Sequence, residues 1–465
     1  MPQHPEKRAL ERSTLFVTSL TSFIGPFMIS SVNVALPAIQ KELGIDAVLL
    51  SWIATAYLLS VAVVLVPAGK IGDIYGRKRV FVTGLLTLSL ASLLAALSKG
   101  IFLLMLSRIL QGAGAAMSVT TGMAILTSVF PPQERGRVIG IYVAAVYIGL
   151  SAGPLVGGIM TQHLGWRSIF VLLVPMGLAA VALTLRFLKQ EWKDEKIGAL
   201  DIMGSCLYGT AIMALVWGAT QIPSSTGILS GAVGLAGLVL FYRHQQRVAF
   251  PVMEVTLFKK NKTFTFSSLA ALLNYSATYA VTFLMSLYLQ YIKGMSPRDA
   301  GLVLMSQPLL MALFSPLAGR LSDRIDPRLL ATGGMFCTLL GVLFFTGLTA
   351  ETPLGLILAN LVLLGFAFAL FSSPNMSTIM GSVDLRHYTA ASGTVATMRL
   401  LGQMTSMAIA TLVLAWIMGP VTIGEEHHDR FLVAVRTIFA CSALLCTAGI
   451  SFSWFRGNLR GGREP

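Results

Sequence analysis

The chain consists largely of long stretches that contain no Asp, Glu, Lys or Arg. The first, residues 13–40, is 28 residues long, and the longest, residues 202–242, extends over 41. About 20 apolar residues suffice to cross a bilayer as a helix. Only 12% of the 465 residues are charged, whereas a soluble globular protein has about a quarter. The chain is therefore predicted to be an all-α polytopic membrane protein. Residues 13–40 exceed the apolar core of a signal peptide and are expected to form a retained first span.

Charged connectors divide the chain into fourteen predicted transmembrane helices. Six candidate spans precede the connector 189–201 and six follow the connector 243–262. The stretch 202–242 is too long for one helix and contains Pro and Gly at 221–227, so it is predicted to form two. The candidate spans are 13–40, 49–69, 79–98, 101–126, 137–161, 167–187, two within 202–242, 263–292, 300–319, 328–349, 353–380, 389–418 and 431–455. The predicted domains are an N-terminal six-helix bundle (1–188), two linker helices with charged connectors (189–262) and a C-terminal six-helix bundle (263–465).

The charge distribution predicts an orientation and excludes some partners. With the N-terminus inside, 25 of the 34 Lys and Arg residues lie in cytoplasmic segments, which satisfies the positive-inside rule and places both termini in the cytoplasm. The net charge of +14 is spread over short loops rather than gathered on one face, so nucleic acid is not an expected partner. The four cysteines lie within apolar stretches without the spacing of metal ligands, so no metal site is predicted.

A polar loop follows the second span in each six-helix set, and the two loops resemble one another. The first is GKIGDIYGRKR at 69–79. Residues 67–73 resemble residues 316–323, and Asp323 follows Asp73 by 250 residues. A carboxylate near a helix end can pair with a nearby arginine, which would form a latch that closes one side of the membrane; simple anchoring of the fold is the alternative. The residues assigned a conformational role here are Gly69, Asp73, Gly76, Arg77, Gly319 and Asp323.

The fifth predicted span carries a stripe of glycines. Gly149, Gly153 and Gly157 are spaced by four residues and therefore lie along one face, with Gly158 beside them. Small residues let a facing helix approach closely, and Pro154 removes a backbone donor and favours a kink. The stripe is expected to form a rocking interface between the two halves; a static packing seam is the alternative.

Three motifs in this order resemble those of a known family. Residues 69–79 resemble the loop 2–3 signature of the major facilitator superfamily, and RILQG at 108–112 resembles its fourth-helix motif. GLSAGPLVGG at 149–158 resembles the fifth-helix motif of its drug antiporters. With fourteen spans, the chain is similar to the 14-helix drug:proton antiporter family of the EmrB/QacA type. This resemblance implies a secondary transporter in the cell (inner) membrane that works by alternating access and exchanges its substrate for protons.

Several polar residues inside the spans are candidates for substrate binding or coupling. A cation within the membrane needs a partner or a wet cavity, and two arginines are predicted there. The candidates are Asn33, Tyr57, Arg108, Gln111, Asn274, Tyr275, Asn360, Asn375 and Arg399. Met28 occupies the first-helix position where many relatives carry an aspartate, and no carboxylate or histidine is predicted in the middle of the membrane. Proton coupling usually needs such a titratable group, so this departure argues against carboxylate-based coupling.

The expected function is export of hydrophobic or amphipathic compounds, with proton antiport implied by the resemblance. The alternatives are transport of an anionic solute by means of Arg108 and Arg399, a lipid-handling flippase, and a membrane scaffold. The chain contains no GxxxxGK[ST] phosphate loop, so ATP is not expected as a partner. No nucleophile and base constellation is recognised, so neither an enzyme activity nor a cofactor is expected. The expected partners are a small-molecule substrate, protons and the lipid bilayer, and a monomer is consistent with the sequence.

Overall fold

The computed structural model describes residues 5–193, 200–221, 224–252, 255–322, 324–383 and 388–457. Within these ranges the regular secondary structure is entirely helical. Fourteen helical segments there are long and apolar enough to cross a membrane. The predicted fold class, an all-α protein with fourteen transmembrane helices, is confirmed.

The first eight spans are single helices. They are α1 (Pro5–Leu43), α2 (Ala47–Tyr75), α3 (Arg77–Ala96), α4 (Ile101–Val129), α5 (Pro132–Leu164), α6 (Arg167–Phe187), α7 (Ile202–Gln221) and α8 (Ser225–Gln245). The predicted break in the 41-residue apolar stretch lies between α7 and α8. There the hydroxyl of Ser224 accepts a hydrogen bond of 3.1 Å from the Gly227 amide, which satisfies one of the free donors at the start of α8.

The last six spans follow the short helix α9 (Thr256–Lys260). The first combines α10 (Lys262–Thr278), α11 (Ala280–Leu287) and the π-helical turn η1 (Tyr288–Ile292), and the second combines α12 (Pro297–Leu304) with α13 (Ser306–Ser322). The others are α14 (Pro327–Thr346), α15 (Leu354–Gly381), α16 (Tyr388–Ile417) and α17 (His428–Phe455).

The first two spans of this second set are interrupted, whereas the sequence predicts continuous helices. In the first span, the Ala280 amide donates to the hydroxyl of Ser406 at 3.0 Å and so leaves the helical hydrogen-bond ladder at Tyr279. In the second, the interruption at Met305 precedes Pro308, which has no amide hydrogen to donate to the preceding turn.

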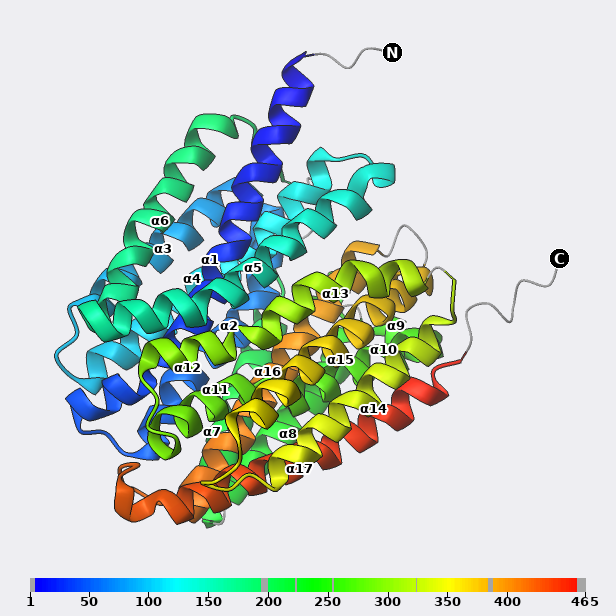
Figure 1. Ribbon diagram of the computed structural model, residues 1–465. Coiled ribbons are helices and arrows are strands. Elements are labelled where there is room, and N and C mark those ends of the chain that lie inside the picture. Colours follow the sequence, from blue (N-terminus) through cyan, green and yellow to red (C-terminus); the bar gives the residue numbers. More distant parts are fainter. Residues whose placement is uncertain are drawn as a thin grey trace.

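Figure 1 shows two groups of helices, α1–α6 and α10–α17, inclined to one another, with both chain ends toward the same end of the molecule. We call this end the terminal end, and we call the opposite end, which carries the connection 44–46, the distal end. Between the groups, α5 packs against α12 and α13, and α2 packs against α16. The linker helix α7 packs against both α2 and α16 and therefore lies beside this second seam.

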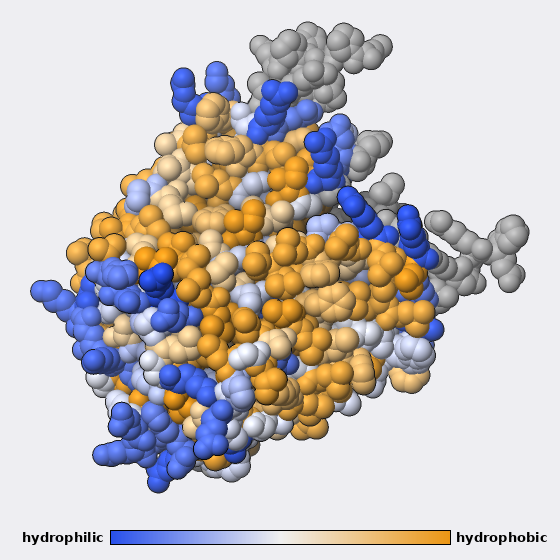
Figure 2. Space-filling model, viewed as in Figure 1, coloured by the Kyte–Doolittle hydropathy of each residue, from blue (hydrophilic) through white to orange (hydrophobic). Residues whose placement is uncertain are grey.

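The outer surface is apolar along the helices. Figure 2 shows an apolar belt between hydrophilic residues that gather at the distal and terminal ends. Large apolar side chains within the belt are strongly exposed, among them Leu90, Leu235 and Leu444. A soluble monomer rarely exposes a large contiguous apolar surface, so the belt is the surface that meets the bilayer hydrocarbon.

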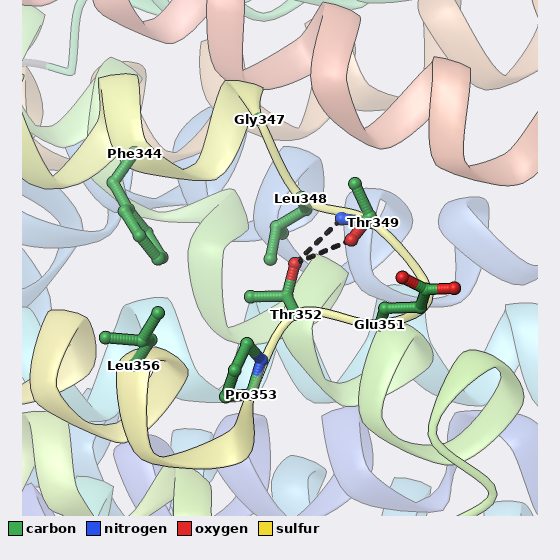
Figure 3. Close-up of a pocket in the computed structure, with 8 residues that line it drawn as sticks. All are labelled: Phe344, Gly347, Leu348, Thr349, Glu351, Thr352, Pro353 and Leu356. Atoms are coloured by element: carbon green, nitrogen blue, oxygen red, sulfur yellow. Dashed lines mark hydrogen bonds between the residues drawn. The ribbon is translucent and has the colours of Figure 1, made fainter.

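A shallow pocket lies at the distal end in the connection between α14 and α15 (Figure 3). The Thr349 amide donates a hydrogen bond of 2.9 Å to Thr352 Oγ1 across the pocket wall. Arg436 of α17 donates from Nε to the Leu348 carbonyl at 2.5 Å. The pocket therefore belongs to a connection that side chains hold in place at the membrane surface, away from the contacts between the two groups.

Candidate functional site

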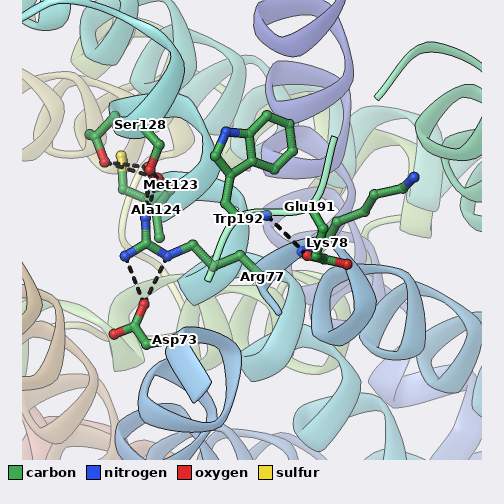
Figure 4. A network of polar contacts seen from close by, with 9 residues as sticks. Asp73, Arg77, Lys78, Met123, Ala124, Ser128, Glu191 and Trp192 are labelled. Atoms are coloured by element: carbon green, nitrogen blue, oxygen red, sulfur yellow. Dashed lines mark hydrogen bonds and ion pairs between the residues drawn. The ribbon is translucent and has the colours of Figure 1, made fainter. Parts of the chain in front are cut away.

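The loop between α2 and α3 holds an ion pair at the terminal end (Figure 4). Arg77 donates from Nε to Asp73 Oδ1 at 2.8 Å, and its second terminal nitrogen lies 2.7 Å from the same oxygen. The remaining terminal nitrogen donates to Ser128 Oγ at 2.5 Å and to the Ala124 carbonyl at 3.4 Å. One guanidinium thus ties the end of α2 to the end of α4, and the predicted partners Asp73 and Arg77 are brought together.

The segment after α6 closes over this loop, which the sequence reasoning missed. Glu191 Oε1 accepts a hydrogen bond of 2.8 Å from the Lys78 amide, and the Arg77 amide donates to the Trp192 carbonyl at 2.8 Å. Gly76 separates α2 from α3 with a φ of +116°, a region that side-chain-bearing residues rarely adopt. A Cβ there would lie 2.6 Å from Glu191 Cδ, so both backbone and space require glycine. The only signal in the sequence was the charged connector that follows α6.

The two polar loops have equivalent glycine contacts. A Cβ on Gly69 would lie 3.0 Å from Thr120 Cγ2 of α4, and one on Gly319 would lie 3.0 Å from Ser373 Oγ of α15. Each glycine therefore faces the second helix after its own, which agrees with the repeat between the two halves. Asp323 lies outside the described residues.

The glycine stripe of α5 faces α1 of the same half. A Cβ on Gly149 would lie 2.5 Å from the Phe23 carbonyl oxygen, and one on Gly157 would lie 2.7 Å from Ser31 Cα. The Ser31 hydroxyl donates a hydrogen bond of 3.0 Å to the Gly153 carbonyl between them. The prediction that these three glycines form the interface between the two halves is therefore wrong, because α1, a helix of the same half, covers their common face.

The contact of α5 with the other half is formed by its neighbours. A Cβ on Gly158 would collide with the Pro297 carbonyl at the start of α12, and one on Gly301 of α12 would collide with the Pro154 carbonyl. Gly158 and Pro154 are therefore the predicted α5 residues that meet the second half. Gly301 was missed because it has no partner glycine at regular spacing.

Arg108 is a buried cation with no carboxylate partner among the residues that the structure describes. It is 1% exposed; its Nε donates to the Ile53 carbonyl at 3.0 Å, and a terminal nitrogen donates to Gln111 Oε1 at 2.8 Å. Gln111 in turn donates to Ser92 Oγ at 2.9 Å. The guanidinium lies 4.5 Å from the centre of the Tyr57 ring, within the range of a cation–π interaction. The structure thus brings the predicted residues Arg108, Gln111 and Tyr57 into one cluster.

Arg399 of α16 is half-buried and lies among aromatic side chains. It interacts with the phenol groups of Tyr275 and Tyr142, and Tyr275 packs edge-on against Phe368 at 5.3 Å. Tyr147 of α5 and Phe368 of α15 belong to the same apolar cluster. Residues of both halves therefore surround this cation. Tyr142 and Tyr147 were missed because nothing in the sequence relates α5 to α16.

The remaining predicted polar residues lie in different places. Asn360 donates to the Gly341 carbonyl at 2.9 Å and joins α15 to α14. Asn375 accepts from Arg456 at 2.7 Å and donates to the Ser267 carbonyl at 3.1 Å, so it joins helices within the second half. Asn274 is fully buried, and neither of its side-chain amide atoms has a hydrogen-bond partner among the described residues.

Hydrogen bonds join the two halves at the distal end. Ser286 donates to the Asn33 carbonyl at 2.8 Å, and Gln290 donates to the Val34 carbonyl at 2.9 Å. On the other side, Thr411 Oγ1 accepts from Ser51 Oγ at 3.0 Å. Three further contacts there are Thr55 with Thr411, the Ala47 amide with the Val421 carbonyl, and Tyr291 with Gln40. We call these contacts together the distal seam.

One acidic side chain is buried near the start of α1. Glu11 is 8% exposed, and its Oε1 has no hydrogen-bond partner within the described part of the chain. Thr14, one turn further, is also buried with an unpartnered hydroxyl. The side chain of Glu11 is therefore packed inside the protein rather than solvated. It was missed because residues 1–12 read as a polar tail.

Comparisons with known proteins agree with this arrangement. The family model of the Major Facilitator Superfamily matches residues 18–242 and 267–464. The riboflavin transporter RibZ of Clostridioides difficile (strain 630) is 31% identical over 93% of this chain and 95% of its own length. The multidrug resistance protein Stp of Mycobacterium tuberculosis (strain CDC 1551 / Oshkosh) is 31% identical over 90% of this chain and 79% of its own length.

A solved structure has the same fold. The crystal structure of the peptide transporter POT in complex with alafosfalin superimposes with a TM-score of 0.70 at 14% sequence identity, and the match covers 96% of this chain and 97% of that one. The family match extends over both halves, and the helices that carry the motifs are arranged as in a solved transporter. The chain therefore belongs to the Major Facilitator Superfamily and is a membrane transporter.

Proposed function

We propose that this transporter exports hydrophobic or amphipathic small molecules from the cell by alternating access, with its terminal end in the cytoplasm. The observation that carries the proposal is the distal seam, because hydrogen bonds from both sides of the molecule close the halves together at that end. A transporter in this state presents its central residues toward the terminal end. The similarity to the multidrug resistance protein Stp supports a hydrophobic substrate.

Proton antiport is part of the proposal, and the variant Glu11→Gln tests whether this buried side chain contributes to it. Glu11 is chosen for its position, because it is 8% exposed and its Oε1 has no hydrogen-bond partner among the described residues. In proteoliposomes, an imposed pH gradient should drive uptake of the aromatic cation ethidium by the wild type. Glu11→Gln should transport ethidium down its own gradient but lose the response to pH. Glu134→Gln, in the first turn of α5, is the control for loss of a carboxylate and should keep that response. An unchanged response in Glu11→Gln would exclude this residue as the proton carrier.

Transport of an anionic aromatic solute is the second candidate function. The observation that favours it is Arg399, a cation that tyrosines of both halves surround. The similarity to the riboflavin transporter RibZ supports an aromatic substrate. Parallel flux measurements with ethidium and fluorescein separate the two functions. Ethidium flux alone supports drug export, whereas fluorescein flux that depends on Arg399 supports anion transport.

A further inference from the structure

An apolar groove runs along the outside of the molecule between α2 and α7. Its long walls are five residues of α2 between Val63 and Ile71 and five residues of α7 between Ser205 and Met213, and Val80 and Met117 complete it. Most of these side chains are apolar, and Cys206 on the α7 wall is exposed. The groove therefore opens toward the bilayer and lies between the first half and a linker helix.

The length of the groove is close to the thickness of one leaflet of a bilayer. From Val63 to Ile71 the wall advances by eight residue steps along the helix, a rise of about 12 Å at 1.5 Å per residue. One leaflet contributes about 15 Å to the hydrocarbon core. Ile71 lies near the end of α2 and Ser205 lies in the first turn of α7, so the groove occupies the leaflet on the terminal side.

Cations lie where the groove reaches the membrane surface. Lys70 directly precedes Ile71, and Lys78 and Arg79 directly precede Val80. The Arg79 side chain is 80% exposed, and its contact with Glu191 is long, at 3.8 Å. In Figure 4 the Lys78 ammonium points away from the Asp73–Arg77 pair. This end of the groove is therefore complementary to an anionic headgroup, because basic residues at the membrane surface attract anionic lipids.

A glycine keeps the groove open. Gly209 lies on the α7 wall, and a Cβ there would lie 3.1 Å from Val63 Cγ1 on the opposite wall. Any larger side chain would therefore extend into the space between the two helices. We propose that this groove binds one acyl chain of an anionic phospholipid, whose phosphate contacts Lys70, Lys78 and Arg79.

Lipid retention tests the proposal directly. The purified protein is placed in nanodiscs that contain equal amounts of phosphatidylglycerol and phosphatidylcholine, and retained lipids are counted by native mass spectrometry. The wild type should retain phosphatidylglycerol preferentially, and Gly209→Phe should lose that lipid. Gly231→Phe is the matched control, because a Cβ at Gly231 meets no atom within 4 Å. The double variant Lys70→Gln/Arg79→Gln should bind phosphatidylglycerol roughly 30-fold more weakly. Equal retention by Gly209→Phe and wild type would overturn the proposal.

A second measurement needs no substitution in the groove. Cys206 is the exposed cysteine and lines the groove, whereas Cys337 and Cys441 lie elsewhere and serve as internal references. Maleimide labelling of the detergent-solubilised wild type should slow at Cys206 when phosphatidylglycerol is added, and should slow less with phosphatidylcholine. Equal protection by both lipids would contradict a specific anionic site. Protection by ethidium without protection by phosphatidylglycerol would identify a groove for solutes and would also overturn the proposal.

Discussion

The hydroxyl of Thr411 in the second half lies within hydrogen-bond distance of two hydroxyls of the first half, Ser51 at 3.0 Å and Thr55 at 3.2 Å. These contacts hold α16 against α2 at the distal end. The substitution Thr411→Val keeps the shape of the side chain but removes both hydrogen bonds. At about 1 kcal/mol for each hydrogen bond, the equilibrium should shift roughly 30-fold toward a state that is open at the distal end.

Spin labels at Lys41→Cys and Glu425→Cys report this change, because both positions are exposed on the distal face of opposite halves. Their distance distribution should broaden toward longer values in Thr411→Val. Thr437→Val provides the control, since the hydroxyl of Thr437 bonds only within its own helix. Identical distributions in all three proteins would show that the distal seam does not set the resting state.

The loop ion pair leads to a second prediction. Asp73→Asn removes the charge that faces Arg77 at 2.7 Å. The pair is partly exposed, so its loss should cost only about 1 kcal/mol of stability, and the amount of protein in the membrane should stay close to normal. If the pair is a latch, ethidium flux should fall at least about fivefold. Asp46→Asn is the control, because asparagine caps α2 as well as aspartate does. Full activity of Asp73→Asn would leave the pair with an anchoring role only.

The surroundings of Arg399 lead to a third prediction. Arg399→Gln removes a cation that interacts with two phenols. Hydrogen bonds to charged groups are worth about 1.5–3 kcal/mol, so an anionic substrate bound there should show a KM raised at least about tenfold. Ethidium transport should not weaken. Arg186→Gln, at an exposed position at the end of α6, controls for the general loss of a cation. Unchanged fluorescein kinetics would remove the anion-transport function.

The stability of the region around the linker helices should depend on pH. Burial alone would raise the pKa of Asp201, but hydrogen bonds from His244, the Gly204 amide and Gln245 outweigh it and hold the pKa below its usual value. A carboxylate with a lowered folded-state pKa stabilises the fold above its unfolded pKa of about 3.9, and this contribution is lost as the pH falls through the folded value. Asp201→Asn should therefore melt below the wild type at pH 7, and the difference should close below about pH 4. A difference that is constant with pH would show that the charge does not matter.

Much of the fold could be predicted from the sequence, because the cost of burying charge in lipid acts locally along the chain. Stretches without charges mark the spans, and the one-turn spacing of Arg108 and Gln111 places them together. Helical spacing also shows that Gly149 and Gly153 share a face. It does not show which helix covers that face, because this depends on packing between distant segments. For the same reason the electrostatic interaction of Arg399 with Tyr142 could not be predicted.

The interruption at Tyr279 has a consequence for how the distal end can open. Because the Ala280 amide bonds to Ser406 of a neighbouring helix, the junction of α11 with α10 has fewer helical hydrogen bonds to resist bending than a continuous helix would have. The segment beyond the interruption carries Ser286 and Gln290, which bond to the first half. A swing of this half-helix alone would separate those contacts. The first movement of the transport cycle would then involve a few residues with a low energetic barrier, and the large bodies of the two halves would follow.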